Sequence, residues 1–155
     1  MTWYPHITVA AVAERSGKFL LVQERNEFGQ AVINQPAGHL EEGESLIDAV
    51  IRETLEETGW HFKPQSLINF CLYKAPANQI TYLRCNFSGR VLGRFSDVAI
   101  DSEIEQVLWL SESELQRRPT RSPMVLAAIR GYRTGQRYPL SLLQTFLEEH
   151  HALEI

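Results

Sequence analysis

The apolar positions at the start of the chain fall into short, nearly continuous runs. Residues 6–13 (HITVAAVA) and 18–24 (KFLLVQE) are apolar on both faces, which is typical of strands buried within a sheet. Between them, ERSG contains a glycine suited to a tight turn, so the two runs predict a hairpin. A third short strand is expected at residues 31–34, followed by a loop over residues 35–44.

From Ser45 onward the apolar positions follow the period of a helix. Ser45 is a suitable N-cap and Asp48 follows three positions later, a variant of the capping box, while Gly59 is a suitable C-terminal stop. We expect an apolar stripe on this helix to pack against a sheet. Its members are Ile47, Ile51 and Leu55, with Val50 at the margin.

The rest of the chain alternates predicted strands and helices. Strands are expected at residues 66–74, 80–92 and 105–110, with a turn at 76–79 between the first two. Ser111 with Glu114, and Ser122 with Pro123, are typical of two further helix starts. This order predicts an α/β sandwich with helices on the faces of a mixed sheet. No repeat or linker is visible, so residues 1–155 are expected to form a single domain.

Composition narrows the class of protein. The 155 residues are 44% hydrophobic and 22% charged, which is ordinary for a globular protein, and the formal net charge of −4 argues against a nucleic-acid duplex as partner. No apolar run approaches the ~18 residues of a membrane span, and the N-terminus lacks the order of a signal peptide. We therefore expect a cytoplasmic protein without a membrane partner. Cys71 and Cys85 lack zinc-site spacing and are interpreted as buried, reduced thiols.

Residues 38–60 concentrate negative charge, with seven carboxylates, one arginine and no lysine. Helical spacing places Glu53, Glu56 and Glu57 on one stripe, where like charges repel. Arg52, four residues from Glu56 on one side and from Asp48 on the other, is expected to brace only the edge of this cluster. A solvated face that merely keeps the helix soluble is the alternative interpretation.

The donor chemistry favours a metal site over a solvated face. Carboxylate oxygens without His or Cys prefer Mg²⁺ or Mn²⁺ to zinc. Magnesium typically shares its coordination between one or two protein carboxylates and the phosphates of a substrate. The stretch therefore indicates chemistry on phosphate esters.

The same stretch resembles the signature of the Nudix hydrolases, G-x5-E-x7-R-E-U-x-E-E-x-G-U, in which U is a bulky aliphatic residue. Both U positions depart from this pattern, being Thr54 and Trp60, which puts local packing in question more than metal chemistry. All fixed positions are present, at Gly38, Glu44, Arg52, Glu53, Glu56, Glu57 and Gly59.

This resemblance implies a magnesium-dependent hydrolase of a diphosphate linked to another moiety, with a Nudix-type α/β/α sandwich and Mn²⁺ as a substitute metal. It also implies that Arg52 orients a ligand glutamate, and that Glu44 lies near the helix start. The implied metal ligands are the side chains of Glu53, Glu56 and Glu57 and the backbone carbonyl of Gly38.

A general base is often supplied in this family by a glutamate outside or at the edge of the box. Glu103, in the segment before the predicted strand that contains Trp109, is the preferred candidate by resemblance. Glu105 lies in the same segment, Glu57 is an alternative base, and acidic residues in solvated loops are common.

Candidates for binding the substrate are less distinctive. Three basic residues are candidates for phosphate contacts, although a turn histidine is often structural and bases on a sheet are often exposed. They are His39, Arg84 and Lys74. Aromatic residues near strand ends are candidates for stacking on a base, although they are often core or rim residues. They are Trp3, Tyr4 and Tyr73. For Arg121 and Arg137, helix capping and solvent exposure are equally good interpretations.

Within the family, the resemblance extends to the bacterial NudJ phosphatase subgroup, through HITVA, NQPAGHLE and residues 121–140. It implies nucleoside tri- and diphosphates, or the diphosphate of the thiamine pyrimidine precursor, as substrates. The alternatives are an ADP-ribose or dinucleoside pyrophosphatase and, from another class, a Nudix-fold ligand sensor without turnover. The oligomeric state is expected to be a monomer or a homodimer.

Overall fold

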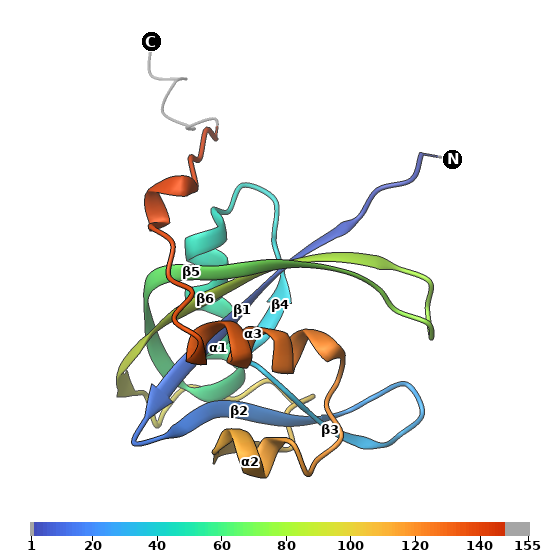
Figure 1. The fold of residues 1–155 in the computed structure, drawn as a ribbon, viewed down its shortest axis with the longest axis vertical. Coiled ribbons are helices and arrows are strands. Elements are labelled where there is room, and N and C mark those ends of the chain that lie inside the picture. The colour runs from blue at the N-terminus through green and yellow to red at the C-terminus, as the bar shows by residue number, and fades with distance from the viewer. Residues whose placement is uncertain (1, 148–155) are drawn as a thin grey trace.

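The structure is a computed structural model and describes residues 2–147 (Figure 1). Among these residues no helix is long and apolar enough to cross a membrane. The elements follow the order β1 (His6–Arg15), β2 (Lys18–Arg25), β3 (Ala31–Asn34), β4 (Ala37–His39), α1 (Leu46–Thr58), β5 (Trp60–Lys74), β6 (Thr81–Arg94), β7 (Gln106–Leu110), α2 (Glu112–Leu115), α3 (Pro123–Arg133) and the 3-10 turn η1 (Leu140–Leu142).

The strands form a mixed sheet in the order β3-β2-β1-β6-β5, with β4 paired to β1 and β7 paired to β2. β1 runs parallel to β6 and antiparallel to β4 over its first half, and its last residues pair with β2. Because β1 joins β2 only through Glu14 and Arg15, the sheet divides into a β4-β1-β6-β5 part and a β3-β2-β7 part. The cavity described below opens between these two parts.

Helices cover both faces of the sheet, with α1 on one side and α3 on the other (Figure 1). One core cluster contains Val9, Val50, Phe62 and Phe87, and the other contains Val12, Leu21, Ile68 and Ile129. The two clusters use alternate residues of β1, which explains why this strand is apolar on both faces. The predicted α/β/α sandwich with a mixed sheet is confirmed.

The predicted hairpin turn and two predicted helix starts are also confirmed. Ser16 and Gly17 adopt positive φ angles of 53° and 78°, as a tight hairpin turn requires. Ser111 and Glu114 form a complete capping box, and the Ser122 hydroxyl accepts a hydrogen bond from the Met124 amide. Polar side chains thus define these helix starts as the sequence predicts.

Two strand predictions are wrong in their bounds. The expected loop over residues 35–44 contains the three-residue strand β4. It pairs with β1 in antiparallel fashion, Ala37 opposite Ala10 and His39 opposite Thr8. A three-residue strand shows too little alternation to be recognised. β5 begins at Trp60 rather than residue 66, because register shifts near Pro64 disrupt its alternation.

Helix α1 begins and ends as predicted, but a different face is buried. The Ser45 hydroxyl accepts from the Asp48 amide, and Gly59 closes the helix at φ 76°. Ile51 and Leu55 are only half-buried. The buried residues are Ala49, Val50, Thr54, Glu57 and Thr58.

The threonine hydroxyls explain this rotation of α1. Thr54 donates to the Val50 carbonyl at 2.7 Å and Thr58 donates to the Thr54 carbonyl at 2.6 Å, so both can be buried with their polar groups satisfied. The same rotation turns Glu57 towards the interior.

Candidate active site

A cavity of about 430 Å³ lies where the two parts of the sheet separate. Glu53 and Glu57 of α1 line it on one side, together with the backbone of β4. Thr8 of β1 and Arg84 of β6 line it from the sheet. The other lining segments are the ends of β2 and β3, the β5–β6 hairpin, and residues 101–103 and 121–124.

Glu57 is a buried carboxylate, with 8% of its surface exposed. It accepts a hydrogen bond from the Ala37 amide of β4 at 2.9 Å. Burial raises the pKa of Glu57 to about 8, and the nearby carboxylates of Glu24, Glu53 and Asp101 add to this. Burial likewise raises the pKa of Glu53, against the opposing effect of Arg52. A nearby cation is therefore required to hold Glu57 ionised at neutral pH.

Arg52 binds the centre of the acidic cluster. Its Nη1 donates to Glu53 at 2.7 Å and to Glu56 at 3.2 Å, and its Nε donates to Glu44 at 2.6 Å. Nη2 donates to the His39 carbonyl at 3.1 Å, which ties α1 to β4. The expectation that Arg52 braces only the edge is therefore wrong: it reaches Glu44 and Glu53, and Glu56 lies outside the cavity lining, exposed to solvent.

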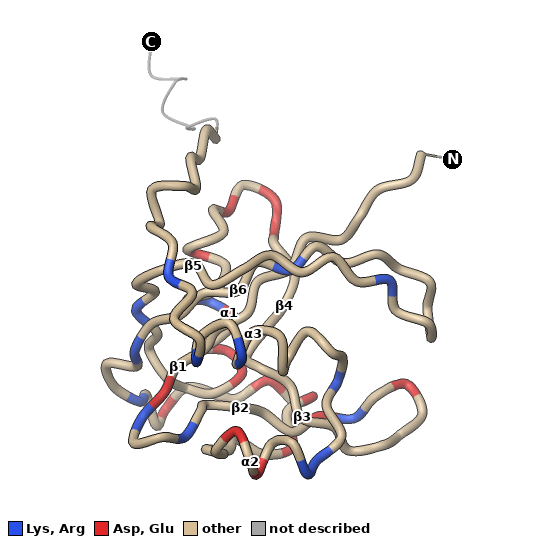
Figure 2. Tube along the Cα trace, viewed as in Figure 1, with Lys and Arg blue, Asp and Glu red and all other residues tan. Residues whose placement is uncertain are grey.

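The acidic residues of the stretch 38–60 begin in the loop that leads into α1 (Figure 2). Glu44 lies in this loop, where its Oε1 accepts from the Glu41 amide at 3.0 Å and its carboxylate pairs with Arg52. The hydrogen bonds from Arg52 lower the pKa of Glu44. Glu44 is thereby held as an anion that fixes the position of Arg52.

Gly38 brings the β4 backbone directly against Glu53. A Cβ atom at this position would overlap the Glu53 carboxyl group, so a larger residue would displace that side chain. The Gly38 backbone and the Glu53 carboxylate therefore lie in one small region.

The donor chemistry of this region fits Mg²⁺ or Mn²⁺. The available ligands are carboxylate and carbonyl oxygens, including two carboxylates whose pKa values are raised. Within residues 2–147 no three His, Cys, Asp or Glu side chains are arranged as a preformed metal-binding site. A bound ion would therefore share its coordination with water or substrate oxygens, which is the mode that magnesium prefers.

The segment before β7 adds acidic groups to the cavity. Glu103 is exposed and lines the cavity, while Glu105 faces away and pairs with Arg25 at 2.9 Å. Asp101, which the sequence analysis missed, also lines the cavity, and its amide donates to the free Glu56 carbonyl at the end of α1. Its place two residues before Glu103 was the only signal available in the sequence.

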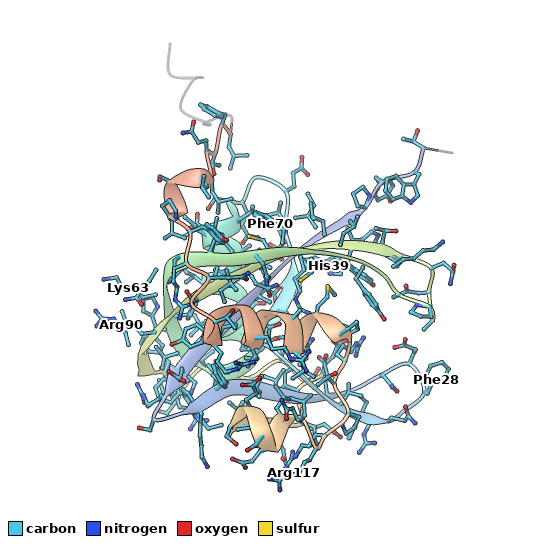
Figure 3. The ribbon with its side chains drawn as sticks, in the orientation of Figure 1. Phe28, His39, Lys63, Phe70, Arg90 and Arg117 are labelled. Carbon is cyan, nitrogen blue, oxygen red and sulfur yellow. The ribbon has the colours of Figure 1, made fainter. Side chains whose placement is uncertain are left out.

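The basic candidates are placed differently from one another. Arg84 lines the cavity and is 3% exposed, so it is not the surface base that was the alternative interpretation. Burial lowers its pKa to about 10. His39, labelled in Figure 3, is an exposed residue of the cavity lining. Its Nε2 lies 3.1 Å from Nδ1 of His6. Burial, followed by the charge of His6, lowers the pKa of His39. Lys74 is exposed and outside the lining.

Of the aromatic candidates, one lines the cavity and two lie outside it. Tyr73 lines the cavity together with Tyr82, which the sequence analysis missed. Trp3 and Tyr4 are both 70% exposed and lie outside the lining. Arg121 lines the cavity and pairs with Glu24 at 3.5 Å.

A family model for the NUDIX domain matches residues 4–128. The chain belongs to the Nudix family. It is 43% identical over 143 residues to phosphatase NudJ of Escherichia coli K12, which covers 92% of each chain, and equally similar to that of Shigella flexneri. A solved NUDIX hydrolase from Nitrosomonas europaea shares 43% identity, with a TM-score of 0.90 over 92% of this chain and 98% of that one.

A more distant Nudix structure supports the fold alone. The NUDIX domain of Shewanella oneidensis NrtR, complexed with ADP ribose, is 20% identical, with a TM-score of 0.69 over 86% of this chain and 89% of that one. The predicted family, its NudJ-like subgroup and the hydrolase class are confirmed: the chain is a Nudix hydrolase acting on phosphorus-containing acid anhydrides. Hydrolases of this family generally use a divalent metal ion.

The departures from the Nudix box fall at packing positions. Thr54 lies on the buried face of α1 and is fully buried. Trp60 is partly buried against Trp109 at 5.9 Å, and the Arg15 guanidinium lies 5.0 Å and 5.7 Å from the two rings. Both departures are accommodated by local packing: the Thr54 hydroxyl is satisfied within α1, and Trp60 packs against Trp109.

Proposed function

We propose that this Nudix hydrolase is magnesium-dependent and cleaves phosphoanhydride bonds of nucleoside tri- and diphosphates, or of small organic diphosphates such as the thiamine pyrimidine precursor diphosphate. The observation that carries the proposal is the placement of Glu53 against Gly38, and of the buried Glu57 against the Ala37 amide, on one side of the cavity. The 43% identity to proteins named phosphatase NudJ supports the substrate class.

The proposed metal ligands are Glu53, Glu56, Glu57 and the Gly38 carbonyl. When bound, the ion would neutralise phosphoryl oxygens and lower the pKa of the attacking water. Arg52 would hold Glu53 and Glu56 in place through its hydrogen bonds. Glu56 is exposed and paired with Arg52, so the proposal requires its side chain to turn towards the cavity when the ion binds.

The reaction needs a base for the attacking water. Water adds to one phosphorus atom, the bond from that phosphorus to the bridging oxygen breaks, and the bridging oxygen leaves with the bonding electrons. Glu103 is the proposed acceptor of the proton from water, because it lines the cavity and is exposed to solvent. Asp101 and Glu57 are the alternatives in the same cavity.

Substrate binding is proposed for His39 and Arg84, which line the cavity, whereas Lys74, exposed and outside the lining, stays a prediction. Tyr73 and Tyr82 offer ring surfaces for the organic part of the substrate. The alternative substrates, ADP-ribose and dinucleoside polyphosphates, would use the same carboxylates. A cytoplasmic location and a monomeric or homodimeric state stay predictions.

A phosphate-release assay tests the proposal. The panel would contain nucleoside tri- and diphosphates, thiamine diphosphate, the pyrimidine precursor diphosphate and ADP-ribose, each with Mg²⁺ and with EDTA. We expect Mg²⁺-dependent release of phosphate from the compounds with a terminal phosphoryl group. Preferred formation of AMP from ADP-ribose would favour the alternative, and turnover in EDTA would contradict the role of the metal.

A further inference from the structure

Arg84 is a buried cation whose hydrogen-bonding capacity is only partly used by the protein. Its side chain is 3% exposed, yet it lines the cavity. Within residues 2–147, its Nε is one of the buried polar atoms without a hydrogen-bond partner. A buried guanidinium nitrogen without a partner is costly to the folded state, which indicates a ligand that supplies the missing acceptor.

The sheet register shows what surrounds Arg84. Arg84 pairs with Thr8 of β1 and with Cys71 of β5, and Thr8 pairs with His39 of β4. Two residues earlier on β6, Tyr82 pairs with Tyr73 and with His6. Side chains two residues apart on a strand share a face, so this aromatic row borders Arg84 on the side of the β5–β6 hairpin.

Polar contacts orient Arg84 from its other end. Its Nη2 donates to Asn34 Oδ1 at 3.0 Å, and Asn34 Nδ2 donates to Glu24 Oε1 at 2.9 Å. Glu24 in turn pairs with Arg121 at 3.5 Å. Asn34 therefore occupies one edge of the guanidinium and leaves Nε for another acceptor.

We propose that Arg84 is a specificity-determining residue that binds the free terminal phosphoryl group of the substrate, with the organic part directed towards Tyr73 and Tyr82. This inference rests on the proposed function. It adds a reason why substrates with a terminal phosphoryl group should be preferred to those in which both phosphoryl groups are esterified.

Depth and charge support this selectivity. Arg84 is so buried that only an unsubstituted end of a phosphate chain can reach it. A diphosphate esterified at both ends carries an organic substituent on each side, and neither of its ends is free to enter. A terminal phosphoryl group also carries about −1.5 to −2 charges at pH 7, and its oxygens accept strong hydrogen bonds from a guanidinium. A methyl ester on that group would remove charge and add bulk at the position of closest contact.

The test compares a nucleoside diphosphate with the same compound methylated on its terminal phosphoryl group. For the wild type we expect kcat/KM to favour the free compound. Arg84→Gln should lower kcat/KM for the free compound by about 10- to 100-fold, mainly through KM. The value of kcat/KM for the methyl ester should change by less than about 2-fold. Arg90→Gln is the matched control, because Arg90 is an exposed residue of β6 at the other end of the sheet from His39 (Figure 3). It should behave as the wild type.

Two additions separate binding from folding. Arg84→Lys keeps the charge but removes the Nε donor, and should lose most of the preference for the free compound while keeping the melting temperature. Calorimetric titration with methylenediphosphonate and Mg²⁺ should show affinity at least about 10-fold weaker for both Arg84 variants than for Arg90→Gln. If the wild type is active but the ratio of kcat/KM values is unchanged in folded Arg84 variants, the role of Arg84 is refuted and the proposed function stands. If the wild type shows no Mg²⁺-dependent hydrolysis, both are refuted.

Discussion

At the scale of single residues, we expect Glu57 to couple the stability of the fold to the binding of a metal ion. Its carboxylate is buried and takes one hydrogen bond, from the Ala37 amide, while burial raises its pKa to about 8. A buried carboxylate is tolerated as an anion only near a compensating charge. The metal-free protein should therefore hold Glu57 partly protonated at neutral pH, and a divalent ion should displace that proton.

Replacing Glu57 tests this coupling. Its pKa in the folded state, about 8, lies above the ordinary value of 4.5, so the folded chain holds a proton that the unfolded chain has released between these pH values. The contribution of Glu57 to the free energy of unfolding therefore falls as pH rises through this window. We expect metal-free Glu57→Gln to melt higher than the wild type at pH 8, by on the order of 5 °C, and nearly equally at pH 4.5.

The control for this melting experiment is Glu103→Gln, which changes the same chemistry at an exposed position and should leave the melting temperature unchanged at both pH values. If Glu57→Gln melts lower than the wild type at pH 8, the carboxylate is not destabilising and the coupling is wrong.

Glu56 differs from Glu57 because it is exposed and contributes little to packing, so its replacement should affect activity rather than stability. Glu56→Gln should lower kcat at least about 100-fold through loss of a metal ligand, while the melting temperature changes by less than about 2 °C. Glu42→Gln, at an exposed loop position outside the cavity lining, is the matched control for kcat and melting. Retained turnover by Glu56→Gln would contradict its role as a ligand.

At the scale of elements, β4 and α1 form the site by close approach. Arg52 joins them through the His39 carbonyl, and Glu57 joins them through the Ala37 amide. Gly38 leaves the space that Glu53 occupies. The distance between strand and helix therefore controls where the carboxylates lie.

Gly38→Ala tests this close approach. The added methyl group would overlap the Glu53 carboxyl group, and we expect a loss of kcat/KM of about 100-fold, since displacement of a catalytic group by ~1 Å has this effect. Gly93→Ala is the control, because no atom lies within 4 Å of the Cβ position there. Equal activities of the two variants would show that Glu53 tolerates displacement.

The segment between β6 and β7 raises the question of which acid accepts the proton. Asp101 is anchored to the end of α1 by its backbone amide, whereas Glu103 is exposed. We expect Glu103→Gln to remove the acidic limb of the pH profile of kcat and Asp101→Asn to retain it. The reverse result would assign the base to Asp101.

The elements that sequence predicted best are those with strong local signals. Ser45 and Gly59 delimit α1 because their capping chemistry is local. The inward rotation of Glu57 was not predictable, since it depends on Thr54 and Thr58 satisfying their hydroxyls within the helix. β4 was missed because three residues are too few for a pattern.

At the scale of the whole molecule, the cavity exists because β1 joins β2 only at its end. The box residues could be predicted from sequence, since their spacing is local. Asn34 and Tyr82 could not, because they reach the cavity through long-range strand pairing with no local signal. The identity of the chemistry was therefore readable from one helix, whereas the substrate pocket depends on the complete fold.

The central claim is that divalent ions bind among the carboxylates of α1 and recruit phosphoryl oxygens of a substrate. Calorimetric titration of the protein with Mg²⁺ or Mn²⁺, in the presence of methylenediphosphonate, measures this directly. We predict saturable binding that is lost in Glu53→Gln and retained in Glu42→Gln. Absence of metal binding by the folded wild type, or binding unaffected by Glu53→Gln, would contradict the account.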